Sequence, residues 1–182
     1  MTAFAALLRA VNVGGTGIIK MAELKALCER IGFGDVSTLL QSGNVVFTSR
    51  AKATTVAETL AGAIEASRGF RPEVIVRTTG ELVDVIARNP FPDAAKTEPN
   101  RLLVSFLAGS PVKDAVDRLA AVKVVKEKLH LSGSELYVHY ADGGMGTSKV
   151  GNAVLERALG VPATARNWNT VTKLSAMLEG MR

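Results

Sequence analysis

The order in which strand-like and helix-like apolar patterns follow one another is the feature that most constrains the fold of this chain. Four short apolar runs are typical of strands, and two longer segments with helical spacing are typical of helices. In chain order these are residues 3–8, 21–31, 35–40, 45–48, 54–67 and 73–77. The order is βαββαβ, the split βαβ or ferredoxin-like unit. A short helix over residues 81–88 follows, with Thr78 and Glu81 at capping-box spacing.

A proline-rich segment, residues 89–100, then divides the chain, because its three prolines are expected to halt regular structure. Beyond it the pattern begins again as βαββα with one further helix, over residues 101–107, 110–122, 127–131, 135–140, 150–159 and 171–181. We predict an α+β fold in which two ferredoxin-like halves with mainly antiparallel sheets pack together as one compact family domain. The first lobe covers residues 1–92. The second, over residues 99–182, is a degenerate copy that lacks a clear fourth strand.

Composition limits the classes of function. Apolar residues make up 47% of the 182 residues, enough for a core, and no apolar run reaches membrane-spanning length. The single cysteine, Cys28, cannot form an internal disulfide and lies on an apolar helix stripe, so we predict a buried, inert thiol and a cytoplasmic protein. Most of the net charge of +5 falls after residue 95, which leaves nucleic acid open as a partner. Nine aromatic residues are too few to favour a base-stacking surface.

Two polar segments, residues 9–20 and 41–44, each follow a predicted strand. In a ferredoxin-like unit the first and second strands run parallel, with the third between them. The loop after the first strand and the turn after the second therefore emerge at the same edge of the sheet. We predict that these two segments lie side by side.

The spacing Gly-Gly-x-Gly-x-x-Lys occurs twice, at residues 14–20 and 143–149. The first copy is not a P-loop, which needs Lys and Ser or Thr directly after its last glycine, and Lys20 stands where a dinucleotide-binding loop has its third glycine. The second copy precedes a predicted helix that Thr147 or Ser148 is available to cap. Both copies are either turns and caps alone or loops whose backbone N–H groups and lysine hold a phosphate or carboxylate.

Five blocks of sequence, LLRAVNVGGTGIIKMAELKALCERIGF, VSTLLQSGNVVF, NPF, GTSKVGNAVLERALG and ATARNWNTVTKL, run from one end of the chain to the other. In these blocks the chain resembles the bacterial family called domain of unknown function 1697. The resemblance implies a small soluble α+β protein and no settled biochemical activity. Members often have glycine where this chain has Ala10. The resemblance also gives weight to Arg9, Asn12, Gly14, Gly15, Ser42, Gly43, Asn44, Ser148, Lys149, Arg166, Asn167, Trp168, Asn169 and Thr170.

The segment before the last helix and the two histidines are the remaining candidates for a functional role. Asn167 or Asn169 is placed to cap the last helix, and Trp168 to anchor it, which leaves Arg166 and one asparagine available for a planar or anionic ligand. The two histidines, His130 and His139, are expected on the outer face of a hairpin with no carboxylate beside them. We therefore predict no metal site, and no cofactor.

Our first function hypothesis is the binding of an anionic or phosphorylated small ligand in a cleft between the halves. Its predicted ligand-binding residues are Arg9, Asn12, Gly14, Gly15, Lys20, Ser42, Asn44, Lys149, Arg166, Asn167 and Asn169. The alternative is an enzyme of acyl or phosphoryl transfer in the same cleft, with Ser42 as nucleophile and Lys149 or Arg166 stabilising charge. A protein that contacts nucleic acid is the third class, and a membrane partner is not expected.

Overall fold

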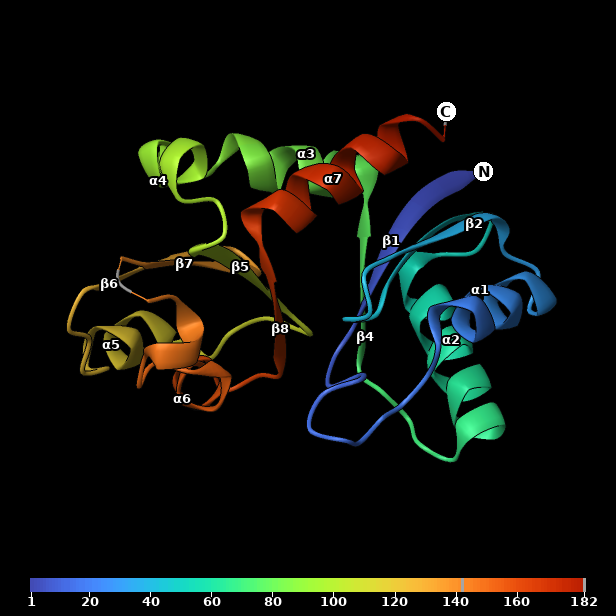
Figure 1. Cartoon of the computed structure of the whole chain (residues 1–182), viewed down its shortest axis with the longest axis horizontal. Helices are drawn as coiled ribbons and strands as arrows, with labels where there is room; N and C mark the ends of the chain where they lie inside the picture. Colours follow the sequence, from blue (N-terminus) through green and yellow to red (C-terminus); the bar gives the residue numbers. More distant parts are fainter. Residues whose placement is uncertain (142, 182) are drawn as a thin grey trace. The chain divides into compact units, whose positions relative to one another are not determined.

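The computed structural model describes residues 1–141 and 143–181 and contains two ferredoxin-like repeats (Figure 1). The first repeat comprises β1 (Thr2–Leu8), α1 (Met21–Arg30), β2 (Gly34–Leu39), β3 (Asn44–Ser49), α2 (Ala53–Arg68) and β4 (Val74–Thr78). The second comprises β5 (Leu102–Leu107), α5 (Ala115–Ala120), β6 (Glu127–Ser132), β7 (Glu135–Tyr140), the 3-10 helix η1 (Met145–Thr147), α6 (Asn152–Leu159) and β8 (Ala163–Asn167). Outside the repeats lie α3 (Thr79–Ala87), α4 (Pro92–Thr97) and α7 (Trp168–Glu179).

The chain divides into two compact units, which we call the first and second halves. The first half consists of Met1–Asp84 and the segment from Lys173 onward, and the second half is Val85–Thr172. Each half contains one four-stranded antiparallel sheet, in the order β2-β3-β1-β4 and β6-β7-β5-β8 respectively. The predicted α+β fold of two ferredoxin-like halves is thereby confirmed.

The second repeat is more complete than predicted, because β8 pairs with β5 along its whole length. The sequence of β8, Ala-Thr-Ala-Arg-Asn, carries neither an apolar run nor β-branched residues at regular spacing. Alanine and asparagine are poor strand formers, so pairing with a central strand determines the conformation here. The expectation of a missing fourth strand was wrong for this reason.

Each half has a core between one face of its sheet and two helices. In the first half, α1 and α2 cover the face that carries alternate residues of β1 and β3. In the second half, α5 and α6 cover the equivalent face. The buried residues that define these two cores include Phe4, Leu8, Leu24, Val45, Phe47 and Leu60 in the first, and Leu103, Leu119, Leu136, Val138, Tyr140 and Leu159 in the second.

Several helix boundaries differ from expectation. The proline-rich segment contains α4, which begins at Pro92, because proline fits the first turn of a helix, where no N–H bond is needed. Helix α5 is shorter than the predicted residues 110–122, and the segment before it is joined to α6 by a hydrogen bond from the N–H of Val112 to the carbonyl of Leu159 (3.0 Å). The predicted capping box is confirmed: Thr78 N–H donates to Glu81 Oε2 (2.7 Å), and Glu81 N–H donates to Thr78 Oγ1 (3.3 Å). Within the described residues, every helix is too short or too polar to cross a membrane.

Candidate functional site

The glycine-rich loop after β1 folds into a small hairpin. The N–H of Asn12 donates to the carbonyl of Gly17 (3.1 Å), which closes the hairpin at its base. Gly14 and Gly15 form the tip with φ values of 62° and 77°, the left-handed conformation that glycine adopts without strain. The loop is therefore an ordered feature of the first half, and its glycines have an evident role in the turn.

Asn12 joins this loop to the turn between β2 and β3. Its side-chain amide donates to the carbonyls of Gln41 (2.8 Å) and Ile19 (2.9 Å), and its Oδ1 accepts from the N–H of Ile19 (3.0 Å). The N–H of Leu8 also donates to the carbonyl of Gly43 (2.8 Å). The predicted proximity of the two polar segments is confirmed, and Asn12 is the side chain that links them.

Asn44 and Ser42 stabilise the same turn. Asn44 is fully buried, and its Nδ2 donates to the carbonyl of Leu39 (2.8 Å) and to Ser42 Oγ (3.1 Å). A nucleophilic serine must pass its proton to an acceptor, whereas an amide N–H is a donor. The contact with Asn44 therefore gives no support to Ser42 as a nucleophile.

The two cationic residues of the loop lie at its two ends. Arg9 is half-buried, and its N–H donates to the carbonyl of Glu73 (2.9 Å). Lys20 is exposed directly before α1, and its N–H donates to Glu23 Oε2 (3.2 Å). The guanidinium of Arg68, 2.6 Å from Glu23, is the main cause that lowers the pKa of this carboxyl, with the Lys20 N–H second. The backbone at Lys20 is thus fixed while its side chain faces solvent.

Ala10 has a φ of 57°, in the left-handed region that side chains with a Cβ atom rarely adopt. This is the position at which the resembling family often has glycine, and the backbone explains that preference. The chain keeps the conformation although alanine makes it strained.

The second glycine-rich loop connects β7 to α6. Contrary to expectation, neither Thr147 nor Ser148 of this loop caps the helix. Helix α6 begins at Asn152, beyond both Thr147 and Ser148, because η1 comes first. The hydroxyl of Ser148 donates instead to Glu127 and accepts from the N–H of Val150 (3.0 Å). Ser148 therefore fastens the loop to the start of the edge strand β6.

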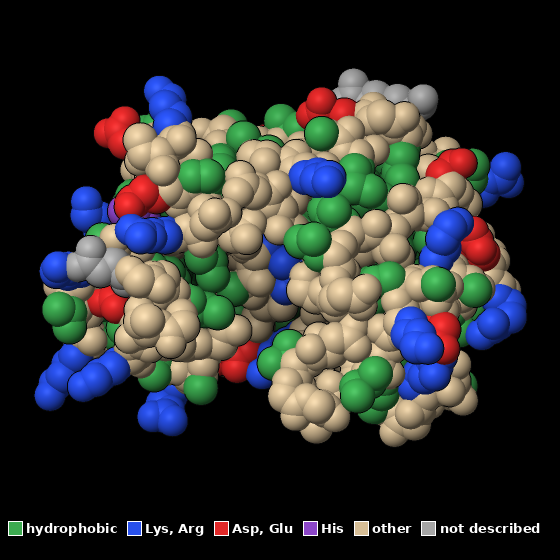
Figure 2. Space-filling model, in the orientation of Figure 1, with side chains coloured by type: hydrophobic (Ala, Val, Ile, Leu, Met, Phe, Trp, Pro, Cys, Tyr) green, Lys and Arg blue, Asp and Glu red, His purple; other side chains and the backbone are tan. Residues whose placement is uncertain are grey.

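Beside this contact lies a cavity of about 350 Å³, which we call the lysine pocket. Its lining includes Lys123 and Lys126 from the segment before β6, and Thr147 and Lys149 from the glycine-rich loop. Figure 2 shows lysine and arginine side chains gathered at the end of the second half that carries α5. Three lysines thus line one cavity within a single half.

Glu127 also lines the lysine pocket, but its carboxylate is already bound. Ser148 Oγ donates to it, and so do the N–H groups of Val125 (2.8 Å) and Lys126 (3.2 Å). These bonds, the one from Ser148 first, lower the pKa of Glu127 from 4.5 to about 2. Its negative charge is thus held by neutral donors rather than by one of the lysines named above.

Arg166 lies on β8 and is buried, with 7% of its surface exposed. Its Nη1 donates to Thr164 Oγ1 (2.7 Å) and to the carbonyl of Ala165 (2.9 Å). Burial lowers its pKa to about 10, so the guanidinium stays charged at neutral pH. Arg166 is therefore a buried cation.

Asn167 is the cap of α7, as predicted, since its Oδ1 accepts from the N–H and the hydroxyl of Thr170 (both 3.0 Å). Asn169 is exposed, and its amide donates to Asn100 Oδ1 (2.7 Å). One asparagine thus has a capping role, and the other bridges to the segment before β5. That residues of both halves share a single ligand stays a prediction.

The second half also contains a histidine–carboxylate pair that was not predicted from the sequence. His139 Nε2 lies 2.9 Å from Glu98 Oε2, and Arg101 Nη1 donates to the other oxygen of Glu98 (2.8 Å). The outer face of the β6–β7 hairpin was expected to be open, and it is open at His130. At Tyr137 it is buried, and at His139 only 12% of the side chain is exposed. The fold of the proline-rich segment over this face had no signal in the sequence.

The fold and the pocket define a protein built from two ferredoxin-like repeats with a basic cavity in the second. The family model described as "Protein of unknown function (DUF1697)" matches residues 1–137 of the 182. The chain therefore belongs to this family. Three of the five sequence blocks lie within the matched residues, and the two blocks after residue 137 lie outside them.

One solved structure supports the fold over the whole chain. The conserved bacterial protein SP0830 from Streptococcus pneumoniae is 22% identical, with a TM-score of 0.76. The match covers 98% of this chain and 99% of that chain. No curated protein matches the sequence. At this level of identity the likeness extends to the fold alone.

Proposed function

We propose that the protein binds a small anionic ligand, such as a phosphorylated metabolite, in the lysine pocket. The observation that carries the proposal is the cluster of Lys123, Lys126 and Lys149 around one cavity whose carboxylate, Glu127, is already held by neutral donors. A ligand with two or more negative charges would be attracted to these lysines.

The size and chemistry of the cavity favour a small molecule. Its volume of about 350 Å³ is at the lower end of the range for small-molecule sites. Thr147 supplies a hydroxyl, while Tyr140 and Val150 supply apolar wall. The hydroxyl of Tyr140 donates to the carbonyl of Val150 (2.8 Å), which gives the wall a fixed shape. Phosphate oxygens accept hydrogen bonds from ammonium groups, so the lysines of this cavity match a phosphate.

Calorimetric titration with inorganic pyrophosphate tests this proposal. We expect binding to the wild type and its loss in the double variant Lys123→Gln/Lys149→Gln. The control Lys52→Gln/Lys96→Gln removes the same charge at exposed lysines of other elements and should bind as the wild type does. Absence of binding to the wild type, or equal loss in both variants, would contradict the proposal.

A duplex RNA oligonucleotide forms the second arm of the experiment. Phosphate contacts make nucleic-acid binding fall steeply with salt. RNA binding with such a salt dependence, together with no heat from pyrophosphate, would favour the nucleic-acid class of function over the one proposed.

A further inference from the structure

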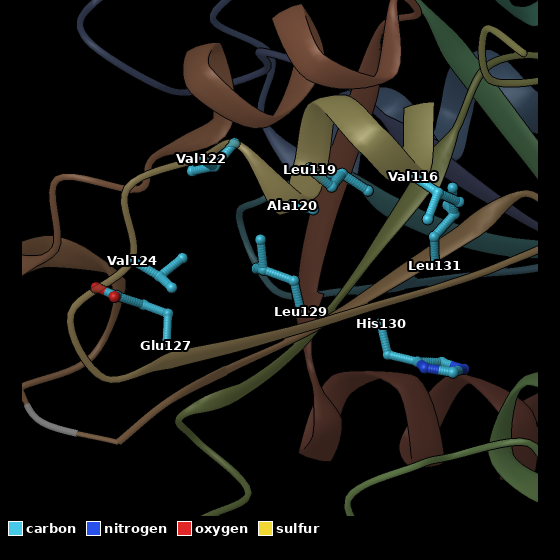
Figure 3. Close-up of a pocket in the computed structure, with 9 residues that line it drawn as sticks. All are labelled: Val116, Leu119, Ala120, Val122, Val124, Glu127, Leu129, His130 and Leu131. Atoms are coloured by element: carbon cyan, nitrogen blue, oxygen red, sulfur yellow. The ribbon is translucent and has the colours of Figure 1, made fainter. Parts of the chain in front are cut away.

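The β6–β7 hairpin has a cavity on each of its two faces. Toward α5 lies an open groove of about 450 Å³, whose apolar walls include Leu119 of α5 and Leu129 and Leu131 of β6. Figure 3 shows Leu129 and Leu131 pointing from the strand toward α5, whereas His130 points to the opposite side. The six residues of α5, compared with ten in α1, leave this part of the sheet open. This face of the hairpin is thus mainly apolar.

The opposite face carries a polar cavity of about 320 Å³, which we call the histidine pocket. Lys128 and His139 are paired in the register of β6 and β7, so their side chains lie on the same face of the sheet, and both line the cavity. The other walls come from the proline-rich segment, with Phe91, Asp93 and Glu98 among them. The histidine pocket therefore combines carboxylates, an ammonium group and an imidazole within the second half.

Glu98 fixes the orientation of the imidazole. His139 Nε2 lies 2.9 Å from Glu98 Oε2, and the other carboxylate oxygen accepts from Arg101 Nη1 (2.8 Å). Arg101 Nη1 also donates to the carbonyl of Ala141 (2.9 Å), which links the carboxylate to the end of β7. An ionised carboxylate only accepts hydrogen bonds, so Nε2 is the donor in this pair. In the neutral ring the lone pair is then on Nδ1.

The second ring nitrogen, Nδ1 of His139, is open to solvent. Among the described residues, His139 makes one hydrogen bond, the one to Glu98, and every buried side-chain nitrogen or oxygen has a partner. Nδ1 is therefore not a buried atom. The ring of Phe91 lies beside the imidazole, with 6.2 Å between the two centroids. A base is thus held in place while its accepting nitrogen stays accessible.

The lining of the histidine pocket favours a small, neutral substrate. The volume of about 320 Å³ is at the lower end of the range for small-molecule sites. Asp93 and Glu98 bring negative charge to the lining, which disfavours anions of the kind proposed for the lysine pocket. Phe91 and Pro90 supply apolar wall. Lys128 is exposed and has no ion-pair partner among the described residues, so its ammonium group is available to a developing oxyanion.

We propose that the histidine pocket hydrolyses small, neutral esters with His139 as general base. Nδ1 accepts a proton from a water molecule while the water oxygen forms a bond to the carbonyl carbon. The carbonyl oxygen becomes an oxyanion, which Lys128 stabilises. The C–O bond to the alcohol then breaks, and the imidazolium returns the same proton to the leaving oxygen. Ester and water thus give a carboxylic acid and an alcohol.

Hydrolysis of para-nitrophenyl acetate, followed by the absorbance of the released para-nitrophenolate, tests this proposal. His139→Gln removes the base and should lower kcat/KM about tenfold or more. The matched control is His130→Gln, which changes the other histidine of the chain, exposed on the same hairpin, and should keep the wild-type value. Equal losses in the two variants, or no turnover by the wild type, would overturn the proposal.

A second pair of variants avoids the half-buried position of His139. Lys128→Gln changes an exposed side chain and should lower kcat/KM about tenfold or more, because the oxyanion loses its cation. Lys52→Gln changes an exposed lysine of the first half and should have no effect. A full rate in Lys128→Gln would overturn the role of this ammonium group. Equal wild-type rates in ordinary and heavy water would overturn general-base catalysis.

The positioning role of Glu98 has its own measurement. At a pH where the ring of His139 is neutral, its nitrogen chemical shifts should show the proton on Nε2 in the wild type. Glu98→Ala removes the acceptor, so both tautomers should be populated and kcat should fall. A wild-type ring that carries its proton on Nδ1 would overturn the proposal.

Discussion

The two halves share one topology, but their long loops lie at opposite ends of the sheet. At the end of the first strand they are alike: Leu8 and Leu107 donate to the carbonyls of Gly43 and Ser134, and the next residue in each half donates to the loop before the fourth strand. The first half has its long glycine-rich loop at this end, between β1 and α1. The second half has its long loop at the other end, between β7 and α6. The two halves thus have the same arrangement of strands and helices, and they differ in which connection is a long loop.

The difference extends from the loops to the cores. In the first half, α1 closes the core, and Asn12 ties the glycine-rich loop to the neighbouring turn. In the second half, α5 leaves a groove, and Ser148 ties its loop to Glu127 at the border of a basic cavity. The polar residues of the first loop thus hold the chain, whereas the second half has an open groove and a cavity lined by lysines. Both proposed sites also lie in the second half.

The largest expected change in unfolding free energy distinguishes the cores of the two halves. Leu24→Ala removes a fully buried side chain and should cost about 2–5 kcal/mol of unfolding free energy. Leu129→Ala alters a wall that is already open, so no closed cavity forms and the loss should stay below about 1.5 kcal/mol. Urea unfolding followed by far-UV circular dichroism measures both. Equal losses would show that the second core is as closed as the first.

An intermediate effect is expected for the two loops. Asn12→Ala removes three hydrogen bonds to backbone groups and should destabilise the protein by about 1–3 kcal/mol. Thr147→Ala removes one exposed bond, to the carbonyl of Gly144 (3.2 Å), and should stay within about 0.5 kcal/mol. Hydrogen exchange at the amide of Ile19 gives a local measurement, since Asn12 Oδ1 accepts from it. Unchanged exchange in the Asn12 variant would contradict the linking role.

The smallest effect separates two carboxyl groups by their response to salt. The pKa of Glu23 is lowered mainly by the charged Arg68, whereas that of Glu127 is lowered to about 2 by the hydroxyl of Ser148 and by backbone N–H groups. Molar salt should therefore raise the pKa of Glu23 toward 4.5 and leave that of Glu127 near 2. NMR titration of the side-chain carboxyl carbons measures both, and a parallel rise would refute the assignment of neutral donors to Glu127.

The same shifts fix the direction of the pH dependence. Because both carboxyl groups have a lower pKa in the folded protein, their stabilising contribution is fully present above pH 4.5. For Glu127 it is lost as the pH falls from 4.5 to about 2. In Ser148→Ala this part of the acid dependence should become smaller, because the main cause of the lowered pKa is removed.

Local patterns in the sequence were enough to predict the order of the elements in the first repeat and the meeting of its two polar segments. Apolar periodicity and turn residues are local properties, and the split βαβ topology converts them into positions at a sheet edge. The capping roles of Thr78 and Asn167 followed for the same reason, since each contact lies within three residues of its partner.

Four features depend on tertiary packing and could not be predicted from the sequence: β8, the pairing of Glu98 with His139, the hydrogen bond from Ser148 to Glu127, and the groove beside β6. Each of these joins residues far apart in the chain, and none leaves a periodic trace along it. A five-residue strand without an apolar run forms because a central strand lies beside it, and a groove exists because one helix stops early. Local sequence pattern places the elements, whereas the groove and the cavity depend on which parts of the sheet the helices leave uncovered.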